Sequence, residues 1–286
     1  QATGTGGNTQ TLTIVVNDAT TVDNGAAIAA ATGAGTVNFS AGGVSDVYAK
    51  IITSTALTAN MQAVDAKDAD VNVAITDTVV VDAAAATALN TLRDDTNGTT
   101  GQVTATINGT AAALATLDAA SASDSALTIT VNDVATAAEG AAIVAATDSA
   151  TVDFSAAGVS DSFGNLTTTT AVSTEMQAID AKDADLNIVV NAAVTTASAN
   201  NVTALNALMS ATTGNVTATV SGDGAELDGL QANSGNNQVL TITVDDAMTG
   251  SAGVTSLNAI AASTSGTVTA AAVSGNSADL ASLTAS

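Results

Sequence analysis

The chain has 286 residues, 46% of them hydrophobic, which is enough apolar material for one large core or two ordinary ones. Its 27 acidic and 4 basic residues give a net charge of −23, and such a surface repels nucleic acids and anionic membranes, which are bound mainly through Lys and Arg. The absence of His and Cys excludes Ser-His-Asp triads, thiol nucleophiles and histidine metal sites, and no apolar run reaches the roughly 18 residues needed for membrane insertion.

Long repeats divide the chain. The phrase LTIVVNDA at Leu12 returns as LTITVNDV at Leu127 and as LTITVDDA at Leu240, with offsets of 115 and 113 residues. The first two copies also share MQAVDAKDADVNV at Met61 and MQAIDAKDADLNI at Met176, again 115 residues apart. The sequence therefore predicts a polar N-terminal segment over residues 1–11, a long repeat over 12–126, a second over 127–239 and a partial third over 240–286, all in one continuous solenoid.

A shorter period predicts alternating strands and helices. Apolar residues at helical spacing, such as Ala86, Leu89 and Leu92, lie between runs rich in Val and Thr. Ala favours helices, whereas Val and Thr favour strands, so we expect about ten strand–helix units, and strands joined by helices run parallel. The predicted strands begin near Leu12, Val37, Val71, Val103, Leu127, Val152, Leu186, Val216, Leu240 and Val268.

The strand pattern also predicts which faces are buried. In the phrase LTITV, Leu127, Ile129 and Val131 point to one side of the strand, while Thr128 and Thr130 point to the other. A parallel strand buried on both sides would be continuously apolar, so a doubly wound sheet is disfavoured. We expect a repetitive α/β solenoid, in which short helices cover one face of the sheet and the other face is open and rich in Thr.

The two ends of the sequence predict head-to-tail self-assembly. Residues 1–16 resemble residues 231–244, and residues 277–283 resemble residues 224–230, which precede that internal segment. The last strand and helix of one copy would thus receive the first strand of the next, and an unclosed contact of this kind makes a filament. An excised piece of a longer covalent array explains the same pattern equally well. The predicted subunit interface consists of Leu12, Ile14, Val16, Val268, Leu280 and Leu283.

Acidic residues recur where the predicted strands end, and Ca²⁺ prefers such oxygen ligands, so calcium is the candidate cofactor. A net charge of −23 also favours a saline or calcium-containing medium, because cations screen self-repulsion. The alternative is that these residues form turns and cap helices, since neither an EF-hand loop nor a Gly-Gly-x-Gly-x-Asp repeat is present. The candidate calcium ligands are Asp18, Asp46, Asp68, Asp70, Asp133, Asp161, Asp183, Asp185, Asp245 and Asp246.

We predict no catalytic residue. A pair of carboxylates could hydrolyse glycosides, but Glu139, Glu175 and Glu226 each lie on a predicted helix, where a solvated surface position is the simpler interpretation. The Thr-x-Thr pairs, such as Thr217 and Thr219, resemble the flat face of ice-binding solenoids. An ordinary solvated sheet face has the same pattern.

The phrases LNALMSATTGNVTATVSG and LNTL…TTGQVTATING resemble the repeat regions of very large secreted or cell-surface proteins of marine and cyanobacterial type. Those regions are rich in Ala, Thr, Val and Asp. The resemblance implies an extracellular or cell-surface location and a matrix-forming or adhesive role. Together with the repeats, it favours a non-enzymatic structural protein that assembles with itself into a filament or surface layer. The alternative is an adhesin-type module whose open Thr-rich face binds a glycan, a mineral or ice.

Overall fold

The structure is a computed structural model, which describes residues 11–39, 42–96, 101–120, 125–148, 150–154, 157–196, 198–233, 235 and 237–284. The predicted α/β class with parallel strands is confirmed, and the strands of the described residues form no closed barrel. The chain groups into two compact units. The first runs to Thr130 and includes Ala142–Val152, and the second comprises Val131–Ala141 and continues from Asp153. Most of the predicted segment 1–11 lies outside the described residues.

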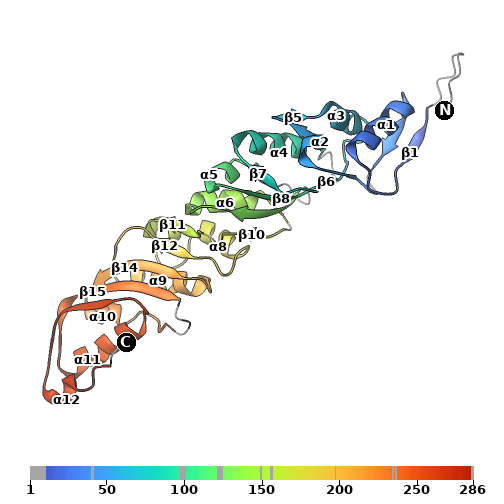
Figure 1. Cartoon of the computed structure of the whole chain (residues 1–286). Helices are drawn as coiled ribbons and strands as arrows, with labels where there is room; N and C mark the ends of the chain where they lie inside the picture. The colour runs from blue at the N-terminus through green and yellow to red at the C-terminus, as the bar shows by residue number, and fades with distance from the viewer. Residues whose placement is uncertain are drawn as a thin grey trace, which may run out of the picture. The chain divides into compact units, whose positions relative to one another are not determined.

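The first compact unit contains a six-stranded parallel sheet and a separate parallel pair, β1 with β2 (Figure 1). The order of the larger sheet is β10-β9-β8-β6-β3, with β7 also paired to β8. The elements in chain order are β1 (Thr13–Val15), α1 (Val22–Thr32), β2 (Thr36–Asn38), β3 (Val44–Asp46), α2 (Tyr48–Ile51), β4 (Ile52–Thr53), β5 (Ala56–Leu57), α3 (Ala59–Asp65), β6 (Val73–Ile75), β7 (Val79–Val81), α4 (Ala83–Thr96), β8 (Val103–Gly109), α5 (Ala111–Leu114), β9 (Ser125–Val131), α6 (Ala137–Ala145) and β10 (Val152–Asp153).

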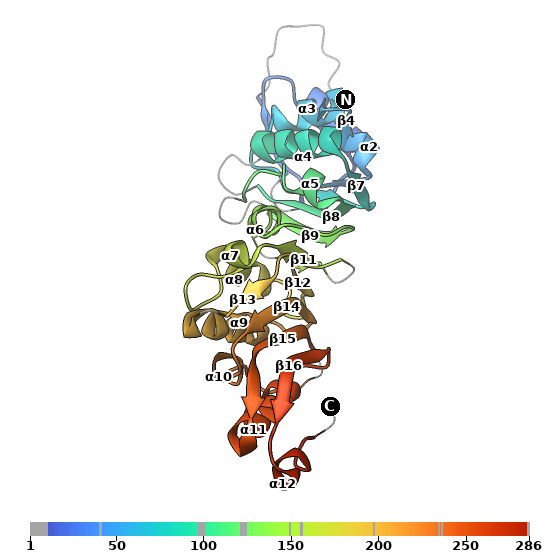
Figure 2. The same cartoon turned by 90° about the vertical axis from the view of Figure 1, so that its left-hand side faces the viewer.

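The second compact unit contains another six-stranded parallel sheet, in the order β11-β12-β14-β15-β16 with β13 also paired to β14. The strands β14, β15 and β16 follow one another in the chain and are neighbours in this sheet (Figure 2). Its elements are β11 (Val159–Asp161), α7 (Phe163–Leu166), α8 (Thr174–Asp180), β12 (Ile188–Val190), β13 (Val194–Thr195), α9 (Ala199–Ala211), β14 (Val216–Gly222), α10 (Gly224–Leu227), β15 (Gln238–Thr249), α11 (Gly250–Ala262), β16 (Val268–Ser274) and α12 (Ser277–Leu280).

All ten predicted strands are present, each starting within two residues of the expected position. The structure adds short strands that the sequence analysis missed: β3, β7, β11 and β13 each follow a break after a predicted strand, and β4 and β5 form a small antiparallel pair. These strands have only two or three residues, so they are too short to show a period of two.

The two faces of the strands differ as predicted. In β14, Val216, Ala218 and Val220 are at most 3% exposed, while Thr217 and Thr219 are exposed. The same alternation occurs in β8. The helices carry the opposing apolar residues, as Leu205 and Leu208 of α9 are fully buried. The described residues include no helix with the length and hydropathy of a membrane span.

Glycine is required at two equivalent positions, one in each unit, where the chain passes close to a neighbouring backbone. Gly158 has a φ of 71°, and a Cβ there would overlap the carbonyl oxygen of Asn187. Gly43 is its counterpart in the first unit, with a φ of 69° and Asn72 as the close neighbour. A left-handed conformation next to another backbone leaves no room for a side chain, which explains why both copies of the phrase GVSD begin with Gly.

Candidate assembly surface

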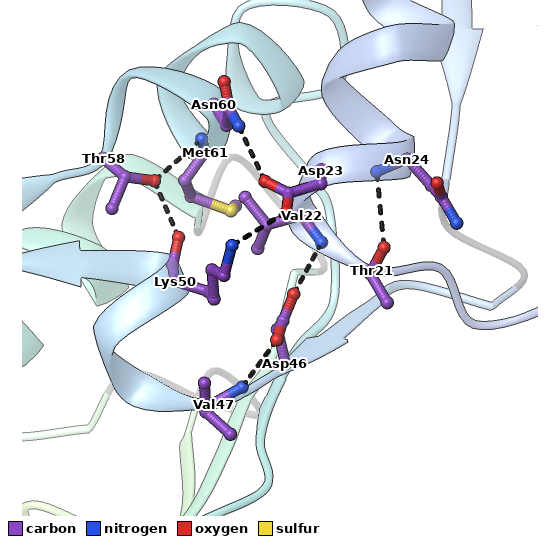
Figure 3. Close-up of polar contacts among 10 residues, drawn as sticks. All are labelled: Thr21, Val22, Asp23, Asn24, Asp46, Val47, Lys50, Thr58, Asn60 and Met61. Atoms are coloured by element: carbon purple, nitrogen blue, oxygen red, sulfur yellow. Dashed lines mark hydrogen bonds and ion pairs between the residues drawn. The ribbon is translucent and has the colours of Figure 1, made fainter.

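The predicted calcium ligands Asp46 and Asp161 are occupied by backbone contacts. Asp46 Oδ2 accepts a hydrogen bond from Val22 N at 3.1 Å, and its Oδ1 accepts one from Val47 N at 2.9 Å (Figure 3). In the second unit, Asp161 Oδ2 accepts from Ala137 N at 3.2 Å. Each carboxylate therefore caps the first turn of a helix that lies 24 residues earlier in the chain.

The pKa of Asp161 shows the effect of these contacts. Burial raises the pKa of this carboxyl group, but hydrogen bonds from Asn165 and from the backbone of Ser162 and Ala137 outweigh burial and lower it below the usual value. The ionised form of Asp161 is thus the one that the fold stabilises.

Asp68 and Asp183 position the two buried phenylalanines. Phe39 N donates to Asp68 Oδ2 at 2.5 Å, and Phe154 N donates to Asp183 Oδ2 at 2.7 Å. Both phenylalanines are 0% exposed. The aspartates thus satisfy backbone N–H groups next to the largest core side chains, which would otherwise be left without a partner.

The remaining candidate ligands do not come together. Asp246 Oδ1 accepts from Gly224 N at 2.8 Å, and no group of three acidic side chains in the described part of the chain is close enough to hold a metal ion. Glu139, Glu175 and Glu226 lie on three separate helices, α6, α8 and α10. Calcium binding remains a prediction. Asp18, Asp133, Asp185, Asp245 and Asp246 are exposed, and Asp70 is half-buried.

A strand and the helix that follows it are called a layer below. An Asn in the phrase LN joins successive layers through main-chain atoms. Asn206 Nδ2 donates to Gly229 O at 2.9 Å, and Asn206 Oδ1 accepts from Gln231 N at 2.9 Å. Asn90 and Asn258 make the same pair of contacts in their own layers, with distances of 2.9–3.0 Å. The phrase LN is visible as a repeat in the sequence, but this pair of contacts, which we call the Asn clamp, is visible only in the structure.

The layer of β16 and α12 leaves its apolar residues partly uncovered. Leu280 and Leu283 align with Leu227 and Leu230 of the layer of β14 and α10. Leu227 and Leu230 are 0% and 6% exposed, whereas Leu283 is 41% exposed and Leu280 is half-buried. Val268 is half-buried as well. The reason is the sheet order: β15 follows β14, but no strand follows β16 among the described residues.

Apolar residues at the first strand, β1, are also more exposed than their counterparts inside the chain. Leu12 is 45% exposed, although its counterparts Leu127 and Leu240 are both 0% exposed. Ile14 is half-buried and Val16 is 8% exposed, while the residues at equivalent positions in β9 and β15 are fully buried. The predicted interface residues form two sets that we call the end surfaces: Leu12, Ile14 and Val16 lie in or beside β1, and Val268, Leu280 and Leu283 lie in β16, in α12 and just after it. In the described chain, β1 and β16 each pair with only one strand.

Comparison with protein-family models, curated proteins and solved structures finds no match to this chain. The repeated contacts within the chain are therefore the basis for a functional interpretation.

We expect the Asn clamp to contribute measurably to stability. Asn206→Ala removes one donor and one acceptor and leaves the Gly229 carbonyl and the Gln231 N–H without this partner, which should lower the free energy of unfolding by about 1–2 kcal/mol. Urea unfolding followed by circular dichroism measures the change. The matched control is Asn201→Ala, which removes a single exposed hydrogen bond to Thr195 O and should cost less.

A second expectation concerns pH. Burial, with a hydrogen bond and charge from Asp185 and the charge of Asp153, raises the pKa of Asp183 to about 6. A carboxyl group whose folded-state pKa is raised stabilises the fold when protonated, so its contribution is lost as pH rises from about 4 through 6. Asp183→Asn keeps an acceptor for Phe154 N and should flatten this part of the stability profile, by on the order of 1–2 kcal/mol.

The control for this measurement is Asp68→Asn. Asp68 accepts a hydrogen bond from Phe39 N, as Asp183 does from Phe154 N. The negative charge of Asp153 beside Asp183 has no equivalent in the first unit, where the corresponding residue is Asn38. Urea midpoints of the parent and both variants between pH 4 and 7.5 separate a local effect from the general decrease in acidic repulsion. An unchanged profile in Asp183→Asn would contradict the assignment.

Proposed function

We propose that this chain is a non-enzymatic structural protein of the cell exterior. Its layers form an α/β solenoid, and copies associate head to tail into a filament or surface layer. The observation that carries the proposal is the exposure of the end surfaces: Leu283 is 41% exposed where its internal counterpart Leu230 is 6% exposed. The partner that fits is a second copy, because β15, the strand that follows β14 inside the chain, resembles the chain's own first strand in sequence.

The pairing of β14 with β15 is the internal template for this contact. The two strands pair in parallel over seven residue positions, with Thr219 opposite Thr241. Because the start of β16 resembles the start of β14 and the first strand resembles β15, the pairing of Thr217 with Val239 places Thr269 of one copy opposite Thr11 of the next. Both residues are exposed within one chain.

The energy of the contact indicates a weak, concentration-dependent association. Fully burying a leucine is worth roughly 1.5–3 kcal/mol, and the exposed parts of Leu12, Leu280 and Leu283 together amount to about one leucine, so they supply only about 1.5–3.5 kcal/mol. Association costs about 4–15 kcal/mol, so strand pairing must contribute as well. A net charge of −23 on each copy opposes contact, and salt or divalent cations would favour assembly by screening it.

The proposed location outside the cell rests on the resemblance to repeat regions of large secreted and cell-surface proteins. The acidic composition agrees with it, since a chain of this charge is best tolerated where ions screen it.

Assembly is tested by comparing two variants that each add one charge to an exposed apolar position. At high concentration in ~0.5 M NaCl, where the Debye length is only a few ångströms, the parent chain should sediment as polymers. Leu283→Asp should raise the concentration needed at least tenfold. The control Val189→Asp, at a position 39% exposed on the open sheet face, should behave like the parent.

Cysteine pairs test the register of the same assembly, because the chain has no native cysteine. A mixture of Thr269→Cys and Thr11→Cys chains should form disulfide-linked dimers on oxidation. Thr269→Cys with Thr13→Cys should not, since a shift of two residues exceeds the reach of a disulfide. A purified parent chain that stays monomeric in all salts would contradict assembly from separate copies and favour a covalent array.

The second candidate is an adhesin-type module. It is favoured by the open face of the second sheet, on which Thr217, Thr219, Thr241 and Thr243 are exposed. Such a face offers hydroxyl groups in registered strands to a glycan, a mineral or ice. Measurement of thermal hysteresis and binding to a glycan array, with and without calcium, should give a signal for this candidate; blank results in both would exclude it.

A further inference from the structure

The second compact unit has a polar pocket that the proposed assembly does not use. Its volume is about 380 Å³, and it is formed by residues of α7 and α8, of the segments next to them, and of the start of α6, whose residues up to Ala141 belong to the second unit. The two carboxylates that line it are Asp161 and Glu175. Most of its other lining side chains are small or carry hydroxyl groups: Ala137, Ala138, Thr167, Thr168, Ser173 and Thr174.

The corresponding place in the first compact unit is occupied by a half-exposed ion pair of the chain itself. Lys50 Nζ lies 2.9 Å from Asp23 Oδ2, and Asn60 Nδ2 donates to Asp23 Oδ1 at 2.8 Å (Figure 3). At the 115-residue offset of the two long repeats, these three residues correspond to Asn165, Ala138 and Glu175. The first unit therefore holds an ammonium group where the second has a pocket.

The surrounding frame is the same in both units. Asp46 accepts a hydrogen bond from Val22 N at 3.1 Å, and Asp161 accepts the equivalent bond from Ala137 N at 3.2 Å. The phrase GVSD, which contains these aspartates, is identical in the two units. The two sites differ in the residues that occupy them. Lys50 and Asp23 of the first unit are replaced by Asn165 and Ala138 in the second.

The changes also leave a net negative charge. The three residues of the first unit sum to zero, from Asp23 at −1, Lys50 at +1 and the neutral Asn60, whereas those of the second sum to −1 because only Glu175 is charged. Glu175 Oε2 accepts from the Thr174 hydroxyl at 3.1 Å. Hydrogen bonds from the backbone of Glu175 and from Thr174 lower the pKa of Glu175, so this carboxylate is ionised at neutral pH.

We propose that this pocket binds an alkylammonium group, with the charged nitrogen at Glu175 and the carbon chain in the space that the Lys50 side chain occupies in the first unit. The group can come from a free amine or from a Lys side chain of another polypeptide. A bare calcium ion fits less well, because Asp161 already accepts three N–H hydrogen bonds, and calcium requires six to eight converging oxygens.

The test uses the intact chain and ¹H–¹⁵N spectra. Titration with n-butylammonium should shift the backbone amides of Asn165 and Glu175 in a saturable way with a millimolar dissociation constant, while n-butanol, the uncharged analogue, should not. Nα-acetyl-lysine N-methylamide is the second probe. Binding of both probes assigns the pocket to Lys side chains, and binding of n-butylammonium alone assigns it to free amines.

Exchange of the three residues between the units provides the matched variants. The triple change Ala138→Asp, Asn165→Lys and Glu175→Asn rebuilds the ion pair of the first unit and should weaken amine binding at least tenfold. The reverse change, Asp23→Ala, Lys50→Asn and Asn60→Glu, should create a second amine site in the first unit. A loss of binding in the first variant could result from misfolding, but a gain of binding in the reverse variant could not.

The proposal is overturned if neither amine gives a saturable shift up to about 50 mM, which corresponds to very weak binding. It is also overturned if calcium chloride alone shifts these amides while both amines do not. Neither result depends on self-association, because the pocket residues are separate from the end surfaces.

Discussion

The contact between one layer and the next is the interaction on which the rest of this structure depends. A single strand with its short helix has one apolar side, and that side is shielded from water only when the following strand pairs with it. Leu230 is 6% exposed under such a neighbour, and Leu283, at the same position in a layer without a following strand in the described chain, is 41% exposed. Burial of apolar area and strand pairing are therefore gained together, as in other repeat proteins.

The composition makes this dependence strong. Aromatic residues make up 1% of the chain, so each layer is built from Ala, Val, Leu and Ile and buries little area by itself. Directional polar contacts then fix the position of one layer on another: aspartates bind backbone N–H groups, and the Asn clamp binds both a carbonyl and an N–H group. Half of the ten aspartates that suggest a metal site from sequence accept hydrogen bonds from backbone N–H groups in this way.

Sequence patterns predict the fold where a local period is long enough. The phrases VTATI at Val103 and VTATV at Val216 alternate over five residues and locate β8 and β14. Strands such as β3 have three residues and depend on pairing with β6, which is not visible locally. Asp46 stands at the predicted junction, but its partner Val22 is brought to it by the tertiary structure. The pocket near Glu175 arises at positions where the two long repeats differ. Repeats are recognised in a sequence by the residues that they share, so such positions are overlooked.

The Asn clamp binds main-chain atoms, so this contact does not depend on which side chains the next layer carries at these positions. The N–H groups it binds belong to Asp118, Gln231 and Thr284, three unrelated residues. Layers can therefore be exchanged or removed without redesign of their contacts. The third repeat is an example: its LN phrase at Leu257 begins 17 residues after Leu240, whereas the corresponding separation from Leu127 to Leu205 is 78 residues. A fold joined in this way can lengthen or shorten by whole layers during evolution.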